Sequence, residues 1–278
     1  MFKKVFTMIL LGSLCVSFTA CGAKTSPTSD STNGDSKQKK VIKLATIPSG
    51  EPRLKWAKEI LAEKDIEAEI VLFDGNSMPA TALKDGDVNG IIVNHKKWME
   101  TFNKENKSNL VMIEPYYYYS PIRMFSKKYK TVEDIPNNAK IAVSNDPSNF
   151  DIALNMLQDV GLIKLGEKTG QFYTDADIIE NPKNIKFVMA ETINVARSID
   201  DADAVISFVF FMHQAGSIDV NQYLYENPTD KEECPVGLIV QDKDKDSEWV
   251  HYLAERLVSD EYLAKFKEMY GDTYKNYK

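Results

Sequence analysis

The sequence predicts an α/β protein with mainly parallel sheets, and three observations carry this prediction. Strand-like runs alternate with runs of helical spacing from residue 41 onward. The stretch 41–278 is long enough for one large core or two lobes. A late strand is followed only by helical pattern, which indicates that the chain returns at its end to the unit where it began.

The first part of this stretch predicts alternating elements. An alternating strand at 41–47 precedes a helix with Pro52 in its first turn and Leu54, Ala57, Ile60 and Leu61 at helical spacing. The remaining elements are predicted as strands at 69–73, 90–94, 109–115 and 120–126, a helix or turn at 79–86 and a helix at 95–106.

A second unit begins near residue 140. After the strand 140–143, Asp146 can cap a helix, Pro147 suits its first position and Gly161 ends it. The apolar face of this helix is predicted to consist of Ala153, Met156, Leu157 and Val160. Further elements are predicted as strands at 184–190, 203–207 and 235–242, a helix at 193–202 and helices from 249 to 278.

The first 40 residues read as a targeting segment and a linker. Lys3 and Lys4 precede an apolar run, and small residues precede Cys21, as in a secretory signal of residues 1–20 that is too short for a confident membrane span. The ending FTAC resembles the lipobox of bacterial lipoproteins, so Cys21 is expected to carry lipid. An anchor helix or an ordinary cleaved signal are the alternatives. The polar stretch up to residue 40 predicts a flexible tether.

Charge and cysteine content argue against nucleic-acid binding, a disulfide and a nucleophilic cysteine. Without the signal, 32 basic residues face 41 acidic ones, and a net charge of −9 argues against nucleic acid as a partner. Cys234 is the one cysteine beyond residue 40, so no disulfide is expected there, and a half-buried structural thiol is favoured over a nucleophile.

Catalytic and metal-binding motifs are missing from the sequence. It has no GxSxG, no HExxH and no paired His/Cys spacing, and its three histidines are scattered. The run GLIKLGEKT comes close to a phosphate loop, but its lysine is one position late and it follows a helix. Neither enzymatic activity, nor a cofactor, nor a metal is predicted.

Three stretches could form a binding site. Asn94, His95 and Trp98 close a strand and open a helix, where binding groups collect in open α/β sheets, although capping and packing also account for them. The run PYYYYSP, with Tyr118, predicts either a ligand wall or core packing. The run SNDPSNFDIAL at 144–154 predicts an open helix start that attracts an anion.

Five stretches together resemble the NlpA-type lipoproteins, the methionine-binding proteins of ABC importers: PATALKDGDVNGIIVNHKKWMETFNKE, SKKYKTVEDIPNNAKIAVSNDPSN, ALNMLQDVGLIKL, IIENPKNIKF and ARSIDDADAVI. The resemblance implies a two-lobed periplasmic-binding-protein fold of type II with the ligand closed between lobes. Lobe one would be 41–126 with 235–278, and lobe two 127–234.

The resemblance also assigns residues. Asn94 and His95 match the polar pair that ends the family's third strand, and Asn145 and Asn149 match its helix-start cradle. In methionine binders of the family an arginine that can hold the carboxylate follows this cradle, and here that position is Phe150.

Three further positions in two stretches depart from the family pattern. Ser207 and Phe208 stand where the family has a polar Asn-rich turn. Arg123 stands where the family usually has a small residue, and it is expected to supply a substitute cation from lobe one.

The resulting prediction is a monomeric, lipid-anchored substrate-binding protein on the extracytoplasmic face of the cell membrane, working with an ABC permease and its ATPase. Its ligand would be a methionine-like amino acid or derivative. One alternative is an aromatic or heterocyclic nutrient such as a vitamin precursor. The other is a surface lipoprotein for adhesion or sensing that has lost transport.

Overall fold

The computed structural model describes residues 41–278. The predicted signal peptide (1–20), the lipidation site Cys21 and the tether (21–40) lie outside the described residues. None of the helices in the described part is long and apolar enough to cross a membrane.

The elements follow one another along the chain largely as predicted. The strands are β1 (Val41–Thr46), β2 (Glu67–Leu72), β3 (Gly90–Ile91), β4 (Leu110–Met112), β5 (Tyr118–Tyr119), β6 (Ile122–Phe125), β7 (Lys140–Ser144), β8 (Lys164–Leu165), β9 (Ile178–Glu180), β10 (Lys186–Ala190), β11 (Ala204–Phe208), β12 (Tyr225–Glu226), β13 (Ile239–Gln241) and β14 (Lys275–Asn276). The α-helices are α1 (Glu51–Ala62), α2 (Met78–Asp85), α3 (Lys96–Asn106), α4 (Pro147–Asp159), α5 (Val209–Ala215), α6 (Asp230–Glu233), α7 (Glu248–Leu257) and α8 (Asp260–Tyr270). The 3-10 helices are η1 (Pro48–Gly50), η2 (Asp175–Asp177), η3 (Thr192–Ile199) and η4 (Asp242–Asp244).

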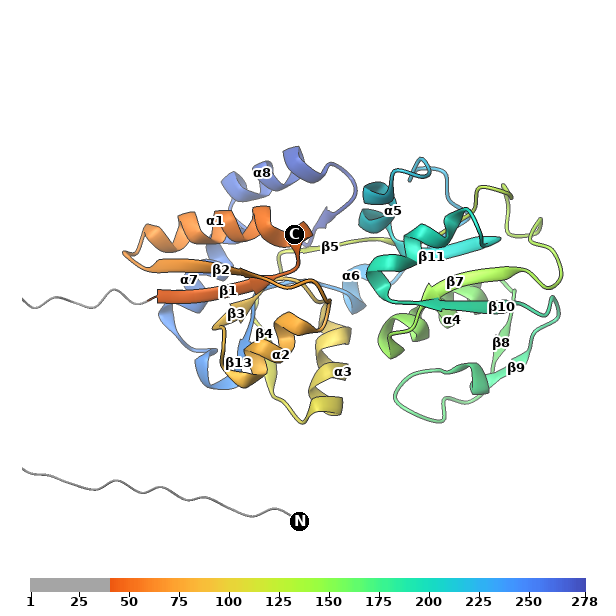
Figure 1. Cartoon of the computed structure of the whole chain (residues 1–278), viewed down its shortest axis with the longest axis horizontal. Helices are drawn as coiled ribbons and strands as arrows, with labels where there is room; N and C mark the ends of the chain where they lie inside the picture. The colour runs from red at the N-terminus through yellow and green to blue at the C-terminus, as the bar shows by residue number, and fades with distance from the viewer. Residues whose placement is uncertain (1–40) are drawn as a thin grey trace, which may run out of the picture. The chain divides into compact units, whose positions relative to one another are not determined.

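Two mixed sheets organise these elements, and Figure 1 shows each with its own helices. The first has the order β2-β1-β3-β13-β4 and the second β10-β7-β11-β6-β12. In the first sheet β1 pairs in parallel with β2 and β3, whereas β13 pairs antiparallel with β3 and β4. In the second sheet β7 pairs in parallel with β10 and β11, whereas β6 pairs antiparallel with β11 and β12. The predicted α/β class is confirmed.

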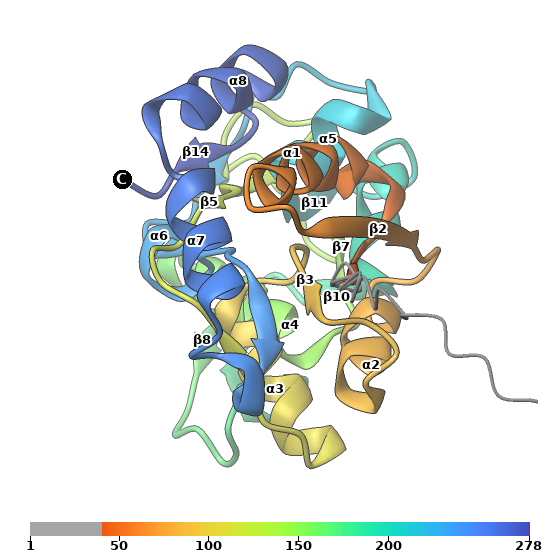
Figure 2. The ribbon, with the colours of Figure 1, turned by 90° about the vertical axis from the view of Figure 1, so that its left-hand side faces the viewer.

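The first sheet is covered on both faces, as the alternation of its strands requires. Ile42 and Leu44 of β1 pack into one core cluster with residues of α1, α7 and α8, whereas Ala45 packs into another with residues of α2 and α3. Figure 2 shows α1, α7 and α8 grouped together and α2 beside α3. Strand β13 lies between β3 and β4, so the predicted return of the chain to the first unit is confirmed.

The second sheet is built in the same way. Ile141 and Val143 of β7 contribute to a core cluster with α4, whereas Ala142 contributes to one with η3 and α5. The predicted helix at 193–202 is the 3-10 helix η3. The predicted helical run 249–278 is divided into α7 and α8, and its last part was wrong, because helix ends at Tyr270 and Lys275–Asn276 form β14.

The strand β6 corrects one detail of the predicted division into lobes. It was expected in lobe one, but it pairs with β11 and β12 and therefore belongs to the second sheet. The apolar residues Ile122 and Met124 of this strand pack into the core beside α4, which holds it there. The other bounds of the two lobes stay a prediction.

Candidate ligand-binding site

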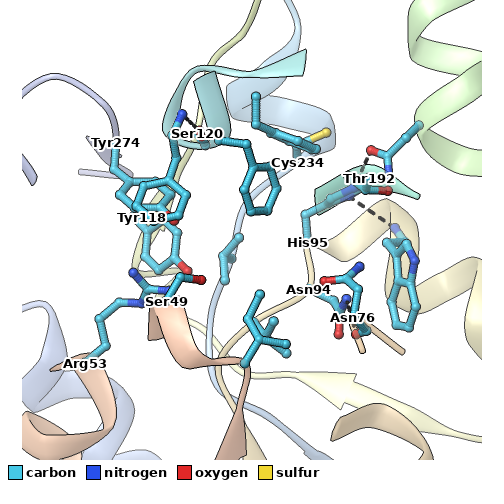
Figure 3. Close-up of a pocket in the computed structure, with 18 residues that line it drawn as sticks. Ser49, Arg53, Asn76, Asn94, His95, Tyr118, Ser120, Thr192, Cys234 and Tyr274 are labelled. Atoms are coloured by element: carbon cyan, nitrogen blue, oxygen red, sulfur yellow. Dashed lines mark hydrogen bonds between the residues drawn. The ribbon is translucent and has the colours of Figure 1, made fainter. Parts of the chain in front are cut away.

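A cavity lies between the two sheets and takes its lining from both. Its empty volume is about 590 Å³, a figure that includes open space at its mouth. Figure 3 shows Arg53, Ser49, Tyr118 and Tyr274 at one end, and Asn76, Asn94 and His95 at the other. The lining consists of Ile47, Ser49, Arg53, Asn76, Val93, Asn94, His95, Trp98, Tyr118, Ser120, Asn149, Thr192, Phe208, Phe210, Phe211, Cys234, Val236 and Tyr274.

His95 connects the two sides of the cavity. It is the N-cap of α3, and its Nδ1 accepts a hydrogen bond from the backbone N–H of Trp98 at 3.2 Å. The neutral ring must then carry its proton on Nε2, which donates to Oδ1 of Asn149 at 3.0 Å. Burial lowers the pKa of His95 to about 4, although the hydrogen bond with Asn149 acts in the opposite direction. His95 therefore stays neutral and serves as a polar contact.

Asn149 is held by the start of its own helix. Asp146 is the N-cap of α4, and its Oδ1 accepts from the backbone N–H of Asn149 at 2.9 Å and from its Nδ2 at 3.0 Å. The side chain of Asn149 is thereby fixed with its oxygen toward His95. The predicted capping role of Asp146 is confirmed.

Asn94 offers an acceptor to the cavity. Its Nδ2 donates to the backbone oxygen of Asn76 at 3.2 Å, whereas its Oδ1 is buried and has no partner in the protein. A buried acceptor without a partner costs free energy, so this oxygen is ready for a donor on a ligand.

Aromatic rings form most of the apolar wall. The ring of Phe208 lies 5.9 Å from that of His95. Trp98 stacks on Phe102 at 5.3 Å, and Tyr118 is packed in a cluster with Tyr274 at 4.7 Å. The cavity thus has a neutral polar end and an extensive aromatic surface.

Two predicted residues lie near the cavity rather than in its lining. Ser207 is buried with an unpartnered Oγ and lines a smaller adjoining pocket with Asn149 and Phe208. Asn145 is exposed and lines an open groove beside Asp146.

The structure does not bring Phe150 or Arg123 to the cavity. Phe150 packs into the core of the second sheet, with its ring edge-on to Phe187 at 5.3 Å. Arg123 pairs through Nε with Glu226 and donates from Nη1 to the backbone oxygen of Val220 at 2.8 Å. The expectation that Arg123 supplies a cation to the ligand is corrected, because a carboxylate of the protein already holds this guanidinium.

Arg53 was missed by the sequence analysis, and it lines the cavity. It lies in the first turn of α1 and is only 2% exposed. The sequence did contain a signal, since position 53 precedes Ala57, Ile60 and Leu61 by four, seven and eight residues and therefore falls on the apolar face of the helix.

The remaining features offer no chemistry of their own. Cys234 is fully buried rather than half-buried, and burial raises the pKa of its thiol well above the ordinary value, which fits a structural cysteine. Within residues 41–278 no group of three or more His, Cys, Asp and Glu side chains could hold a metal ion.

Comparison with known proteins identifies the family. The model of the NlpA lipoprotein family matches residues 42–277. The chain belongs to the NlpA lipoprotein family. It is accordingly a substrate-binding protein rather than an enzyme.

Individual proteins resemble this chain over most of its length. The D-methionine-binding lipoprotein MetQ of Salmonella typhimurium is 33% identical over 249 residues, 87% of this chain and 91% of the relative. Outer membrane lipoprotein 1 of Mannheimia haemolytica is 32% identical over 278 residues, 98% of this chain and 97% of the relative. The substrate-binding protein of a methionine transporter from Streptococcus pneumoniae, a solved structure, is 30% identical with a TM-score of 0.76 and covers 85% of this chain and 95% of its own.

Proposed function

We propose that this protein is the lipid-anchored substrate-binding component of an ABC importer. It would capture a small organic ligand between its sheets and deliver it to a membrane permease driven by its ATPase. Cys21 would carry the lipid, on the extracytoplasmic face of the cell membrane, and the protein would act as a monomer.

One observation carries this proposal. The cavity takes its lining from both sheets, and the hydrogen bond between His95 and Asn149 joins its two sides. A ligand in such a cavity contacts both sheets at once, so its binding favours the closed arrangement. The relatives named as a D-methionine-binding lipoprotein and as the substrate-binding protein of a methionine transporter favour a methionine-like amino acid or derivative as the ligand.

The aromatic wall favours a second candidate ligand. Trp98, Tyr118, Phe208, Phe210 and Phe211 all line the cavity, and flat rings stack well on such surfaces. An aromatic or heterocyclic nutrient, such as a vitamin precursor, would use this wall more fully than methionine would. The non-transport alternative, a surface lipoprotein for adhesion or sensing, needs no ligand in the cavity.

The test combines mass spectrometry of small molecules that co-purify with the protein and a thermal-shift screen of amino acids, short peptides and vitamins. A ligand present at a hundred times its dissociation constant stabilises the protein by about 2.7 kcal/mol, which raises the melting temperature measurably. A broad panel without any hit and without a co-purified molecule would favour the non-transport alternative.

A pair of variants tests whether the ligand binds in this cavity. Asn149→Ala should weaken the shift of any hit, because it removes a lining side chain that is bonded across the cavity. Asn145→Ala, at the same helix start but exposed and outside the lining, should leave the shift unchanged. Equal effects of the two changes would contradict the assignment of this cavity.

A further inference from the structure

Arg53 carries a buried positive charge without an anionic partner in the described chain. Its Nε and Nη1 are buried and have no hydrogen-bond partner in the protein. The guanidinium carbon lies 5.0 Å from the ring centre of Tyr118, 5.2 Å from that of Tyr270 and 5.3 Å from that of Tyr274. A guanidinium does not lose its proton in a protein, so the charge is permanent.

The tyrosines around Arg53 do not neutralise it. Burial raises the pKa of Tyr117, Tyr118 and Tyr274, so all three hydroxyls stay protonated at neutral pH. The ring faces attract the cation, but burying a charge costs free energy unless an opposite charge and hydrogen bonds compensate for it. The hydroxyl oxygens of Tyr117 and Tyr270 are also buried without partners.

The charge of Arg53 stands alone in the cavity wall. No Asp, Glu or Lys is among the described residues that line this cavity, and the remaining titratable groups of the lining are the neutral His95, two tyrosines and a cysteine. The position at which the family has its carboxylate-binding arginine is Phe150, which packs in the core. Arg123 is already paired with Glu226.

We propose that Arg53 binds the anionic group of the ligand, and so takes over the function that the family places at the start of α4. This inference rests on the proposed function and specifies its substrate class, a small organic acid with an apolar or aromatic body. The guanidinium fork can hold a carboxylate through two parallel hydrogen bonds. The rings of Tyr118, Tyr270 and Tyr274 keep solvent away from the guanidinium, which strengthens a charged contact.

The position of Arg53 also determines which end of the ligand lies at which end of the cavity. The anionic group lies at the end of the cavity formed by Tyr118 and Tyr274, away from Asn94 and His95 (Figure 3). An N–H or O–H donor of the ligand then meets the unpartnered Oδ1 of Asn94. Because no carboxylate lines the cavity, a ligand with a net positive charge is disfavoured.

The experiment uses matched pairs of probes that differ only in the anionic group. Calorimetry and thermal shift compare L-methionine, N-acetyl-L-methionine, glycyl-L-methionine, L-phenylalanine and indole-3-acetate, each with its own carboxamide. In the wild-type protein the acid of a binding pair should bind more tightly than its amide by about tenfold or more, the ratio expected for a charged bidentate contact.

Substitutions then assign this preference to Arg53. Arg53→Met should abolish the preference for the acid, while the melting temperature of the ligand-free protein stays the same or rises, since an unpaired buried charge has been removed. Arg53→Lys keeps a charge and should retain a reduced preference. Arg123→Gln, the matched control at an arginine outside the cavity, should leave the preference unchanged.

Other outcomes separate failure of this inference from failure of the proposed function. If amides bind as well as acids, or if Arg53→Met keeps the preference and lowers the melting temperature, Arg53 has a structural role and the inference is wrong while ligand binding stands. If neither member of any pair binds and no small molecule co-purifies, the proposed binding function itself is contradicted.

Discussion

His95 is neutral because of its surroundings, and this has a measurable consequence for stability. Its ring is buried, one nitrogen accepts from the helix backbone and the other donates to Asn149. Its pKa is about 4 in the folded protein against an ordinary value of 6.5. The unfolded chain therefore binds a proton more readily than the folded one between these values, and stability must fall as the pH is lowered through this range.

We predict that the free energy of unfolding loses roughly 2 kcal/mol from this residue between pH 7.5 and pH 5. The variant His95→Asn keeps an oxygen that can cap α3 but has no group that titrates there, so the loss should disappear. Urea unfolding of both proteins at the two pH values measures it. His251→Gln is the control, because His251 is exposed. An equal pH response of wild type and His95→Asn would show that His95 does not titrate as described.

The helices α3 and α4 are joined by an ion pair with a buried member. Asp151 of α4 has a side chain only 1% exposed, and Lys97 of α3 and Lys168 each approach it at 2.9 Å. Its carboxylate also accepts from the backbone N–H of Tyr173 at 2.7 Å. Burial raises the pKa of Asp151, but the bonds from Lys97, Tyr173 and Lys168 outweigh it and hold the pKa below its usual range.

The change Asp151→Asn should destabilise the protein by about 1–3 kcal/mol, because it weakens the bonds that this buried group accepts from Lys97, Lys168 and the backbone of Tyr173, while Lys97 keeps its pair with Glu233. Glu180→Gln is the matched control. Glu180 and its partner Lys164 are both about 60% exposed, and the loss of such a pair should change stability by no more than ~1 kcal/mol. Similar effects of the two changes in urea unfolding would mean that α3 and α4 are not held together by this contact.

Helical periodicity predicted the long elements well. It also indicated which helical face Phe150 and Arg53 lie on, whereas the family resemblance placed Phe150 at the ligand site and did not point to Arg53. Phe150 precedes Ala153 and Leu157 by three and seven residues, so it falls on the predicted apolar face of α4, where the structure places it. Arg53 falls on the apolar face of α1 by the same rule, and there it lines the cavity. A charged residue on an apolar helical face was the sequence signal for a buried charge in the wall of this cavity.

The short elements could not be predicted in this way. The paired part of β3 is two residues long, and β5, β12 and β14 are of similar length. Such strands carry no period that distinguishes them from loops, since their position depends on distant partners, as in the pairing of β14 with β5. The run of tyrosines likewise does not alternate between two faces, because Tyr117 and Tyr118 are both buried in the core that contains Phe266.

In the molecule as a whole, two segments that lead from one sheet to the other are joined by hydrogen bonds to Asp230. One segment leads from β5 to β6, and the other from β12 through α6 to β13. The carboxylate of Asp230 accepts from the backbone N–H of Ile122 at 2.6 Å and from Nδ2 of Asn227. Burial is the main cause that raises the pKa of Asp230 to about 7, with further contributions from Glu226 and Glu233.

This pKa predicts that Asp230 makes the protein less stable as the pH rises. Between about pH 4 and pH 7 the folded chain holds the proton that the unfolded chain releases, so the contribution of Asp230 is largest in acid and is lost as the pH rises through 7. The loss should be roughly 3 kcal/mol between pH 5 and pH 8. It is opposite in sign to the effect of His95, so the two partly cancel in the wild type and a variant is needed to reveal either.

Asp230→Asn supplies that variant, because an amide keeps one acceptor and does not titrate. The variant should be less stable than the wild type at every pH, because its side-chain NH2 group faces an N–H donor where the wild type has an acceptor. This deficit in the free energy of unfolding should shrink by roughly 3 kcal/mol from pH 5 to pH 8. Urea unfolding at pH 5, 6, 7 and 8 measures the difference. Asp260→Asn, at an exposed carboxylate in the first turn of α8 and outside the crossing segments, is the control. A constant deficit for Asp230→Asn would mean that this carboxylate is already ionised at pH 5 and that the two crossing segments are joined by a charged group.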